Sequence, residues 1–164
     1  MNAVATELAK RLIRNFNVAA LECETEEPKY ESLCARLARG TAAQQLGASI
    51  DIVPPGKRSC PYHFHHAQEE MFIILEGTGT LRVAGEMLPI RAGDIAFIPP
   101  GPEYPHHILN TSDAPLKYLS ISTRDSPEIC EYPDSGKYLA YVKGGAFNGL
   151  QRKENNLDYW DGEK

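Results

Sequence analysis

Apolar side chains recur every four positions near the start of the chain, at Val4, Leu8, Leu12 and Phe16. Residues 3–16 contain neither glycine nor proline. This spacing places the four side chains on one face of a helix. We therefore expect a short amphipathic helix that packs against the rest of its own chain or against a sister subunit.

From residue 41 onward the pattern changes to short β-type runs, many of which alternate between apolar and polar positions, as in Leu81-Arg82-Val83. Glycine and proline separate the runs, for example at Pro54-Pro55-Gly56. Many short strands at this spacing predict an all-β sandwich or barrel, and the lack of helical segments between them disfavours a parallel βαβ sheet. The expected strands are 46–53, 70–76, 79–84, 87–91, 94–98, 105–110 and 116–123.

The segments around this region have weaker patterns. Residues 22–30 are acidic and contain Pro28, which indicates a surface connection. Residues 31–38 fit a short helix or a strand equally well. Residues 131–136 have the composition of a turn, and residues 137–143 that of one more strand.

The length of 164 residues fits a single domain with one hydrophobic core. Within it we expect an N-terminal helix and arm over residues 1–40, a barrel core over 46–123 and a C-terminal tail over 144–164. The tail contains three large apolar side chains, the last of them Trp160, which favours a tail held against a surface.

Charge and hydropathy exclude two classes of partner. The net charge is -5 and no run is rich in lysine and arginine, so we expect no nucleic-acid binding. The longest apolar run, Met71–Leu75, is too short to span a bilayer, so we expect no membrane contact. Glu7, Lys10 and Arg11 lie where a signal peptide has its apolar core, and we therefore expect a cytoplasmic protein.

The cysteines are spaced irregularly and form no CxxC pair, unlike those of a zinc knuckle or a disulfide framework. We interpret them as reduced thiols. Cys60 precedes His63 by three residues but is not counted as a ligand, because such a position need not face the same side. The cysteines are Cys23, Cys34, Cys60 and Cys130.

All five histidines lie in two short windows. On a strand, residues two apart share a face, so His63 and His65 direct two imidazoles to one point while His66 faces away. A turn at 66–69 brings Glu70 back opposite them, and the second window supplies a third imidazole. Three imidazoles and a carboxylate suit one divalent ion such as Zn, Fe, Mn, Ni or Co, and they leave positions open for water or substrate.

The two windows resemble the paired motifs of the cupin superfamily, G-x5-H-x-H-x3,4-E-x6-G and G-x5-P-x-G-x2-H-x3-N. The resemblance covers roughly residues 46–123, on the scale of one small domain. This chain has Gly56-x6-His63-x-His65-x4-Glu70-x6-Gly77 and Gly93-x5-Pro99-x-Gly101-x4-His106-x3-Asn110.

The resemblance implies a cupin barrel, a double-stranded β-helix or jelly roll, with His63, His65, Glu70 and His106 as metal ligands. The second motif has two extra residues before its histidine, so His107 is an alternative to His106. The spacing to Asn110 favours His106.

The chain is also similar to small single-domain bacterial cupins labelled mannose-6-phosphate or sugar-phosphate isomerases. This implies an isomerase in which the metal polarises a carbonyl and a separate base moves the proton. Glu103 and Tyr104 are the candidates for that base. Lys57 and Arg58 are candidates for binding the anionic end of a small, polar, oxygen-rich ligand.

Two other functions stay open, because a fold fixes little about activity. A non-heme iron dioxygenase uses the same ligand types. A non-catalytic module that binds a small sugar or acid needs the metal and the pocket but no base. For each of these we expect a homodimer, with residues 3–16 and the strand near 46–53 free to form the contact.

Overall fold

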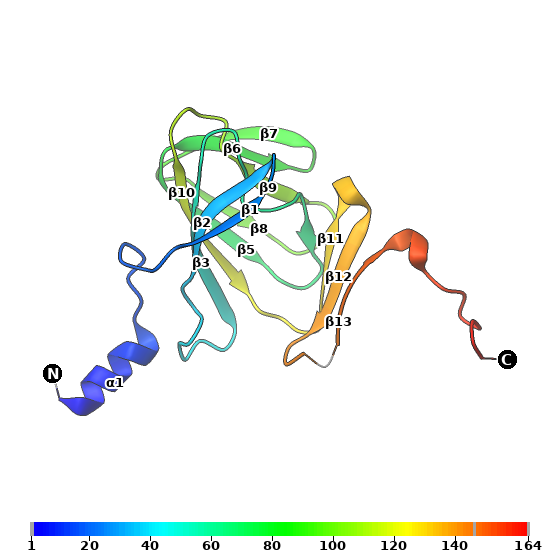
Figure 1. Ribbon diagram of the computed structural model, residues 1–164, viewed down its shortest axis with the longest axis horizontal. Coiled ribbons are helices and arrows are strands. Elements are labelled where there is room, and N and C mark those ends of the chain that lie inside the picture. The colour runs from blue at the N-terminus through cyan, green and yellow to red at the C-terminus, as the bar shows by residue number, and fades with distance from the viewer. Residues whose placement is uncertain (1, 146, 164) are drawn as a thin grey trace.

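The computed structural model describes residues 2–145 and 147–163. Figure 1 shows a barrel of short strands, from which helix α1 and the C-terminal segment project on opposite sides. In the described part of the chain, no helix is both long enough and apolar enough to cross a membrane. The elements are α1 (Ala3–Leu12), β1 (Glu22–Glu26), β2 (Tyr30–Arg36), β3 (Leu46–Val53), β4 (Phe64–His65), β5 (Glu70–Glu76), β6 (Thr78–Val83), β7 (Glu86–Arg91), β8 (Ile95–Ile98), β9 (His106–Leu109), β10 (Leu116–Thr123), β11 (Glu128–Tyr132), η1 (Pro133–Ser135), β12 (Lys137–Val142), β13 (Phe147–Arg152) and η2 (Lys153–Asn155).

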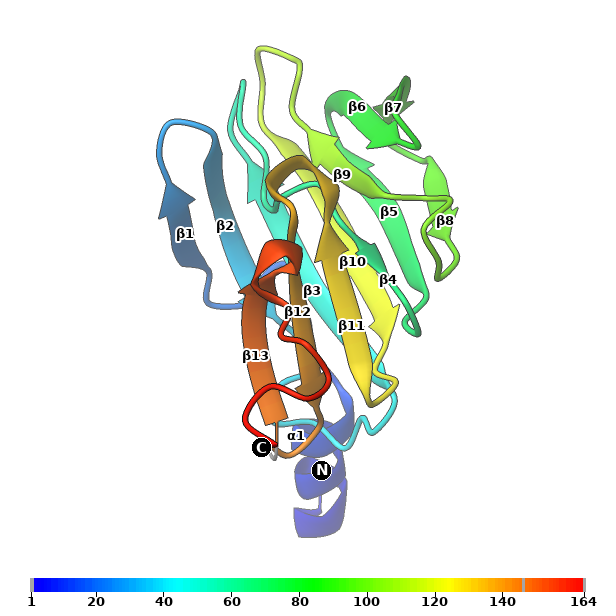
Figure 2. The ribbon, with the colours of Figure 1, turned by 90° about the vertical axis from the view of Figure 1, so that its right-hand side faces the viewer.

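The strands form three antiparallel sheets that wrap around one interior (Figure 2). The largest has the order β1-β2-β3-β10-β5-β8, and the others have the orders β13-β12-β11-β4 and β7-β6-β9. This is the jelly-roll arrangement expected from the sequence. Strands β1 and β2 extend the barrel on one side, and the hairpins of β11, β12 and β13 extend it on another.

The interior is apolar at one end and polar at the other. The apolar end is closed by a cluster in which Val53 and Leu116 are completely buried. The chain approaches itself closely here, since a Cβ at Gly77 would lie 2.6 Å from the carbonyl oxygen of Pro115, and the φ of Gly77 is +85°. Only glycine fits such a position without strain. The cluster is Val53, Phe72, Ile74, Leu81, Ile90, Ile98, Ile108, Leu116 and Tyr118.

The polar end is built by the register of the large sheet. Ser120 on β10 lies opposite Ser49 on β3 and opposite Phe72 on β5. Ser122, one rung further along, lies opposite Glu70. Because directly opposite residues share a face, a row of hydroxyl groups leads toward Glu70. The alternation that buries the apolar cluster therefore also places polar groups at the other end of the barrel.

The strands expected at 46–53, 70–76 and 116–123 have those bounds in the structure, and the other four barrel strands differ from their expected bounds by one or two residues. Two expectations at the N-terminal side are wrong. Residues 22–30 are not a simple connection, because β1 pairs there with β2. Strand β3 is not a free edge for dimer formation, because it pairs with both β2 and β10. The undecided segment 31–38 lies mostly in β2.

Helix α1 begins as expected but ends at Leu12 rather than near residue 16. The side chain of Asn2 caps its first turn by accepting a hydrogen bond from the backbone N–H of Ala5. The helix buries no residue against its own chain, and Val4, Leu8 and Leu12 are 69%, 50% and 63% exposed. Packing of this stripe against its own barrel, one of the two alternatives from the sequence, is therefore wrong.

The expectation that the C-terminal tail is held against a surface is also wrong for the described residues. Tyr159 and Trp160 are 83% and 62% exposed, and Leu157 is 78% exposed. The aromatic rings of Tyr159 and Trp160 contact each other edge to face, with their centroids 4.8 Å apart. This local pair anchors neither ring to the barrel.

We propose that the stripe on α1 contacts a second copy of the chain, because an amphipathic helix that buries nothing in its own chain needs another surface. Light scattering at micromolar concentrations is expected to give the mass of a homodimer. Leu8→Glu is expected to convert it to a monomer, whereas Lys10→Ala, on the polar side of the helix, is not. A monomer mass for the unmodified chain at all these concentrations would contradict the proposal.

Candidate metal centre

Four side chains of metal-ligand type meet at the polar end of the barrel. His63 and His106 are joined across an isolated antiparallel bridge, in which the backbone N–H of each donates to the carbonyl oxygen of the other at 3.1 and 2.7 Å. His65 lies on β4, and Glu70 is the first residue of β5. His63 and His106 are 9% and 1% exposed, so the cluster is almost closed off from solvent.

The three imidazoles converge on one carboxylate oxygen. The Nε2 atoms of His106, His65 and His63 lie 2.9, 3.5 and 3.6 Å from Oε2 of Glu70. These are the four residues that the sequence motifs indicate as ligands. His63, Glu70 and His106 each offer a ligand atom within 4.8 Å of the other two.

The opposite edge of each ring is fixed by an oxygen atom that can only accept a hydrogen bond. Each Nδ1 therefore carries the proton in the neutral ring, and each Nε2 keeps its lone pair. Three lone pairs and a carboxylate oxygen that face one another repel unless a cation lies between them. The donor set thus fits a divalent metal ion. The Nδ1 contacts are His63 with the carbonyl oxygen of Pro61 at 2.9 Å, His65 with Oε1 of Glu128 at 3.2 Å, and His106 with the carbonyl oxygen of Tyr104 at 3.1 Å.

The pKa shifts of the cluster also indicate that a positive charge is favoured beside Glu70. Burial disfavours the ionised form of Glu70, but the nearby imidazoles of His106 and His63 outweigh it and hold the pKa of that carboxyl well below its usual range. Burial also opposes protonation of His63, yet Cys60 and Glu70 raise the pKa of that imidazole. The pKa of His65 is lowered, chiefly by burial. A buried carboxylate held in its charged form is the group that a metal ion binds best.

Glu128 is a buried carboxylate that sequence reasoning missed. Its side chain is 0% exposed and accepts a hydrogen bond from Nδ1 of His65. It also accepts from the backbone N–H groups of His66, Ala67 and Gln68, each at 3.1 Å. Glu128 thus fixes both the ring of His65 and the turn that leads from β4 to Glu70. Such a carboxylate behind a histidine ligand orients the ring and increases its basicity.

The two histidines that the sequence places outside the ligand set also lie outside it in the structure. Nε2 of His66 bonds to Glu131 at 2.9 Å on the outer side of β4. His107 is 1% exposed and packs edge-to-face on Tyr62, with ring centroids 5.3 Å apart. Burial and the nearby Arg58 and Arg82 lower the pKa of His107 to about 4, so it is neutral near pH 7.

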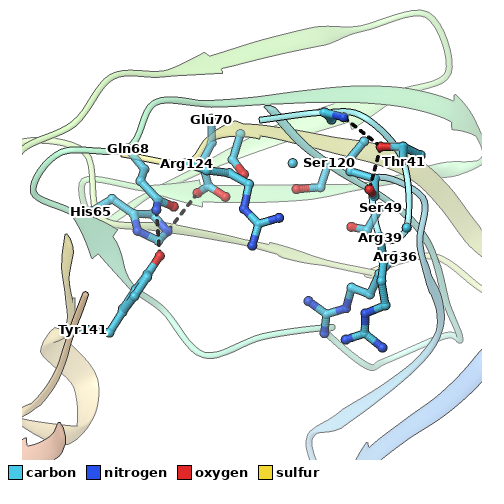
Figure 3. A pocket seen from close by; sticks show the side chains of 16 residues that line it. Arg36, Arg39, Thr41, Ser49, His65, Gln68, Glu70, Ser120, Arg124 and Tyr141 are labelled. Atoms are coloured by element: carbon cyan, nitrogen blue, oxygen red, sulfur yellow. Dashed lines mark hydrogen bonds and ion pairs between the residues drawn. The ribbon is translucent and has the colours of Figure 1, made fainter. Parts of the chain in front are cut away.

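A cavity of about 600 Å³ opens beside the cluster (Figure 3). His65 and Glu70 lie at one end of it, Arg36 and Arg39 lie at the other end, and the guanidinium group of Arg124 lies between the two ends. The hydroxyl of Tyr141 closes the near end, where it accepts a hydrogen bond from Nε2 of Gln68 at 2.6 Å. The rest of the lining includes Ser49, Ser120 and Ser122.

The structure does not bring the other sequence candidates to this cavity. Lys57 is held at the rim by Glu27, at 2.8 Å, and by the carbonyl oxygen of Pro28. Arg58 lines a separate hollow beside Tyr30.

The two candidate bases lie elsewhere as well. Glu103 and Tyr104 belong to the loop between β8 and β9, and neither side chain lines the cavity that contains Glu70 and the arginines. Tyr104 is 45% exposed and contributes only its backbone oxygen, which holds His106.

The comparisons with known proteins agree with this geometry. Residues 49–122 match the family model of the cupin domain. Over this segment, which is a little less than half of the chain, the sequence is similar to a cupin domain. The match begins and ends within the strands β3 and β10, so it covers the barrel that carries the four ligands but neither α1 nor the hairpins of β11 to β13.

Two solved structures resemble nearly the whole chain. A protein of Acidithiobacillus ferrooxidans, provisionally named a sugar phosphate isomerase, superposes with a TM-score of 0.79 at 25% identity and covers 91% of this chain and 96% of its own. A sugar phosphate isomerase from a cupin superfamily, from Silicibacter pomeroyi, gives a TM-score of 0.74 at 24% identity and covers 91% of this chain and 98% of its own. The second likeness shows the fold alone.

Among curated proteins, an uncharacterized protein of Methanocaldococcus jannaschii is 39% identical over 84 residues, which are 49% of this chain and 65% of that protein. An oxalate-binding protein of Thermotoga maritima is 36% identical over 69 residues, 42% of this chain and 54% of that protein. The matches thus span less than two thirds of the length of either relative.

Proposed function

We propose that this cupin binds one divalent metal ion on His63, His65, Glu70 and His106 and isomerises a small sugar phosphate in the adjoining cavity. The observation that carries the proposal is the arrangement of charged groups in the cavity, with metal-type donors at one end, the guanidinium groups of Arg36 and Arg39 at the other, and that of Arg124 between them. A sugar phosphate has the matching ends, a carbonyl with neighbouring hydroxyls and a dianion. The likeness to the Acidithiobacillus ferrooxidans structure, which is provisionally named a sugar phosphate isomerase, supports it.

The separation of the two ends suits a ligand of that size. Glu70 on β5 and Arg36 on β2 are three strands apart in the order β2-β3-β10-β5. At roughly 4.8 Å between neighbouring strands, β2 and β5 are about 14 Å apart. The side chains of Glu70 and Arg36 extend into the space between these strands. The gap that remains between them has room for a short carbon chain and a phosphate.

Two of the three arginines are available to an anion. Arg36 forms an ion pair with Glu24 at 2.8 Å. No ion pair of Arg39 or Arg124 occurs within residues 2–145 and 147–163. Guanidinium groups bind phosphate oxygens in a two-pronged manner, so Arg39 and Arg124 provide the phosphate contacts that Lys57 and Arg58 cannot reach.

The metal, when bound, polarises the substrate carbonyl and stabilises the negative charge that develops on its oxygen. The protein's own side chains bind the sugar hydroxyls and carry the proton. Ser49, Ser120 and Ser122 offer hydroxyls that both donate to and accept from sugar hydroxyls. Asp51 lies in a smaller hollow that shares Ser49, Ser120 and Glu70 with the cavity, and its carboxylate accepts a hydrogen bond from Ser49 at 2.9 Å, so it is proposed as the proton carrier. Burial raises the pKa of Asp51 above its usual value, which favours proton uptake.

The test is binding and turnover of sugar phosphates by the metal-loaded protein. Sugar phosphates are expected to raise the thermal midpoint, and Arg39→Ala with Arg124→Ala is expected to weaken binding by at least tenfold or so, since each charge-assisted contact contributes about 1.5–3 kcal/mol. Lys57→Ala, a cationic side chain outside the cavity, is the matched control and is expected to bind normally. NMR measures the interconversion of aldose and ketose phosphates by the metal-loaded protein. Sugar phosphate binding that is as tight in the double arginine variant as in the unmodified protein would contradict the proposal.

The likeness to an oxalate-binding protein supports a second candidate, a binding module for a small dicarboxylate. Oxalate offers two oxygens to a metal and two to the arginines, so it fits the same polarity. Tight oxalate binding with no turnover of any sugar phosphate would favour this function over isomerisation. Oxygen consumption with iron bound would favour a dioxygenase instead.

A further inference from the structure

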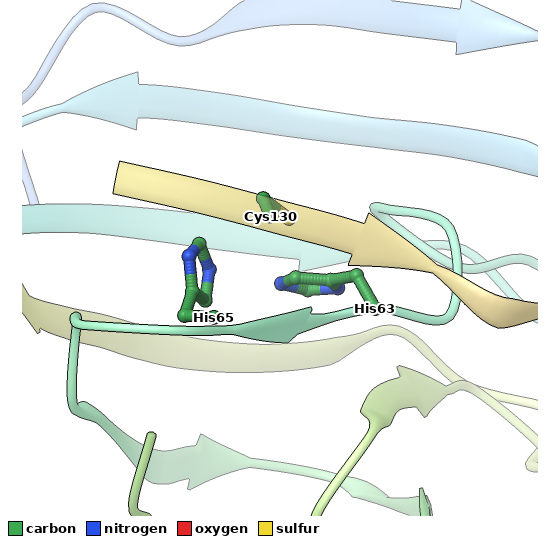
Figure 4. Close-up of side chains that lie close together, drawn as sticks. All are labelled: His63, His65 and Cys130. Atoms are coloured by element: carbon green, nitrogen blue, oxygen red, sulfur yellow. The ribbon is translucent and has the colours of Figure 1, made fainter. Parts of the chain in front are cut away.

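A cysteine from outside the matched cupin segment reaches the metal cluster. Cys130 lies on β11, which pairs with β4 in a register that sets Cys130 opposite His65. Directly opposite residues of an antiparallel pair share a face, so its side chain points to the side of the imidazoles (Figure 4). Cys130 is 3% exposed.

The distances are those of a shared ion. Ligand atoms of His63, His65 and Cys130 all lie within 4.8 Å of one another. Zinc binds sulfur at about 2.3 Å and imidazole nitrogen at about 2.1 Å, so two such atoms on one ion are separated by at most about 4.4 Å. The observed spacing needs only a small closing movement. His63 belongs both to this set and to the set with Glu70 and His106, so it is the ligand that the two sets share.

We propose that Cys130 binds the metal as a thiolate, in addition to the three histidines and Glu70. The inference rests on the metal site of the proposed function and extends it to a ligand type that the cupin motifs do not contain. When the metal–sulfur bond forms, the thiol proton is released to solvent. Thiolate is a soft ligand, so the centre selects zinc, iron or cobalt over manganese among the ions suited to histidine and glutamate alone.

Cys60 provides a matched comparison within the same chain. Its sulfur also lies near His63, but it approaches Nδ1, at 4.0 Å. That edge of the ring is occupied by the hydrogen bond to the carbonyl oxygen of Pro61, and Nε2 is the atom that faces Glu70. Cys60 therefore lies behind the ring and is not expected to bind the ion.

The experiment uses the full chain loaded with Co(II). The unmodified protein is expected to show a sulfur-to-cobalt charge-transfer band in the near ultraviolet. Cys130→Ser is expected to lose this band but keep bound cobalt and its weaker visible bands, whereas Cys60→Ser is expected to keep all of them. Circular dichroism checks that each variant is folded, and Cys130→Ala replaces Cys130→Ser if the hydroxyl is not tolerated.

Three results would overturn the inference. If the unmodified protein binds cobalt without a charge-transfer band, or if Cys130→Ser keeps the band, then Cys130 is not a ligand. Either result leaves the metal site on the histidines and Glu70 intact. If the unmodified protein binds no cobalt at all, the metal site itself fails, and this inference fails with it.

Discussion

Glu128→Ala is expected to lower the free energy of unfolding by about 3–5 kcal/mol, because it removes the acceptor of four hydrogen bonds from a site without solvent. Three backbone N–H groups, those of His66, Ala67 and Gln68, lose their partner together. The ring of His65 also loses the group that fixes it, so metal affinity in the folded variant is expected to fall by about 10- to 100-fold.

Glu131→Ala is the matched control, because Glu131 lies on the same strand and also pairs with a histidine. It contacts His66 and Lys153, both of which are exposed, so we expect a loss of no more than about 1 kcal/mol. Denaturant unfolding measures both variants, and a titration with metal measures the affinity. A Glu128→Ala variant as stable as Glu131→Ala would show that the four hydrogen bonds do not hold the turn.

The sequence predicts the barrel well because its strands are half-buried. Leu116–Thr123, for example, follows Pro115 and alternates buried and half-buried positions over its first four residues, so a turn residue and periodicity indicate where it begins. Strand β1 was missed because all five of its residues, Glu22–Glu26, are exposed. A strand at the edge that buries no side chain has no apolar periodicity, and only its pairing with β2 reveals it.

Some residues of the candidate site can be predicted from their neighbours in the sequence, whereas others are brought to the site only by the fold. The pair His63 and His65 is local, since residues two apart on a strand share a face. Glu128 and Cys130 come from β11, which reaches β4 only through the pairing of distant segments. In the sequence a glutamate and a cysteine after Pro127 have no feature that separates them from surface residues. Arg39 and Arg124 were missed for the same reason, since an unpaired arginine resembles solvated charge until the fold places it.

Replacement of both His63 and His65 by alanine is expected to abolish metal binding. The double variant keeps Glu70, His106 and Cys130, but without the two imidazoles that link them these groups do not hold a divalent ion against water. His106→Ala alone is expected to weaken binding by at least tenfold or so. His107→Ala is the neighbouring control and is expected to leave the affinity unchanged, since that ring faces Tyr62 on the other side of β9.

The most direct test of the metal centre is elemental analysis of the protein purified without a histidine tag. The account predicts about one divalent ion per chain for the unmodified protein and none for the variant with His63→Ala and His65→Ala. An unmodified protein that takes up no metal even when zinc, iron or cobalt is supplied, or a double variant that retains a full equivalent, would contradict it.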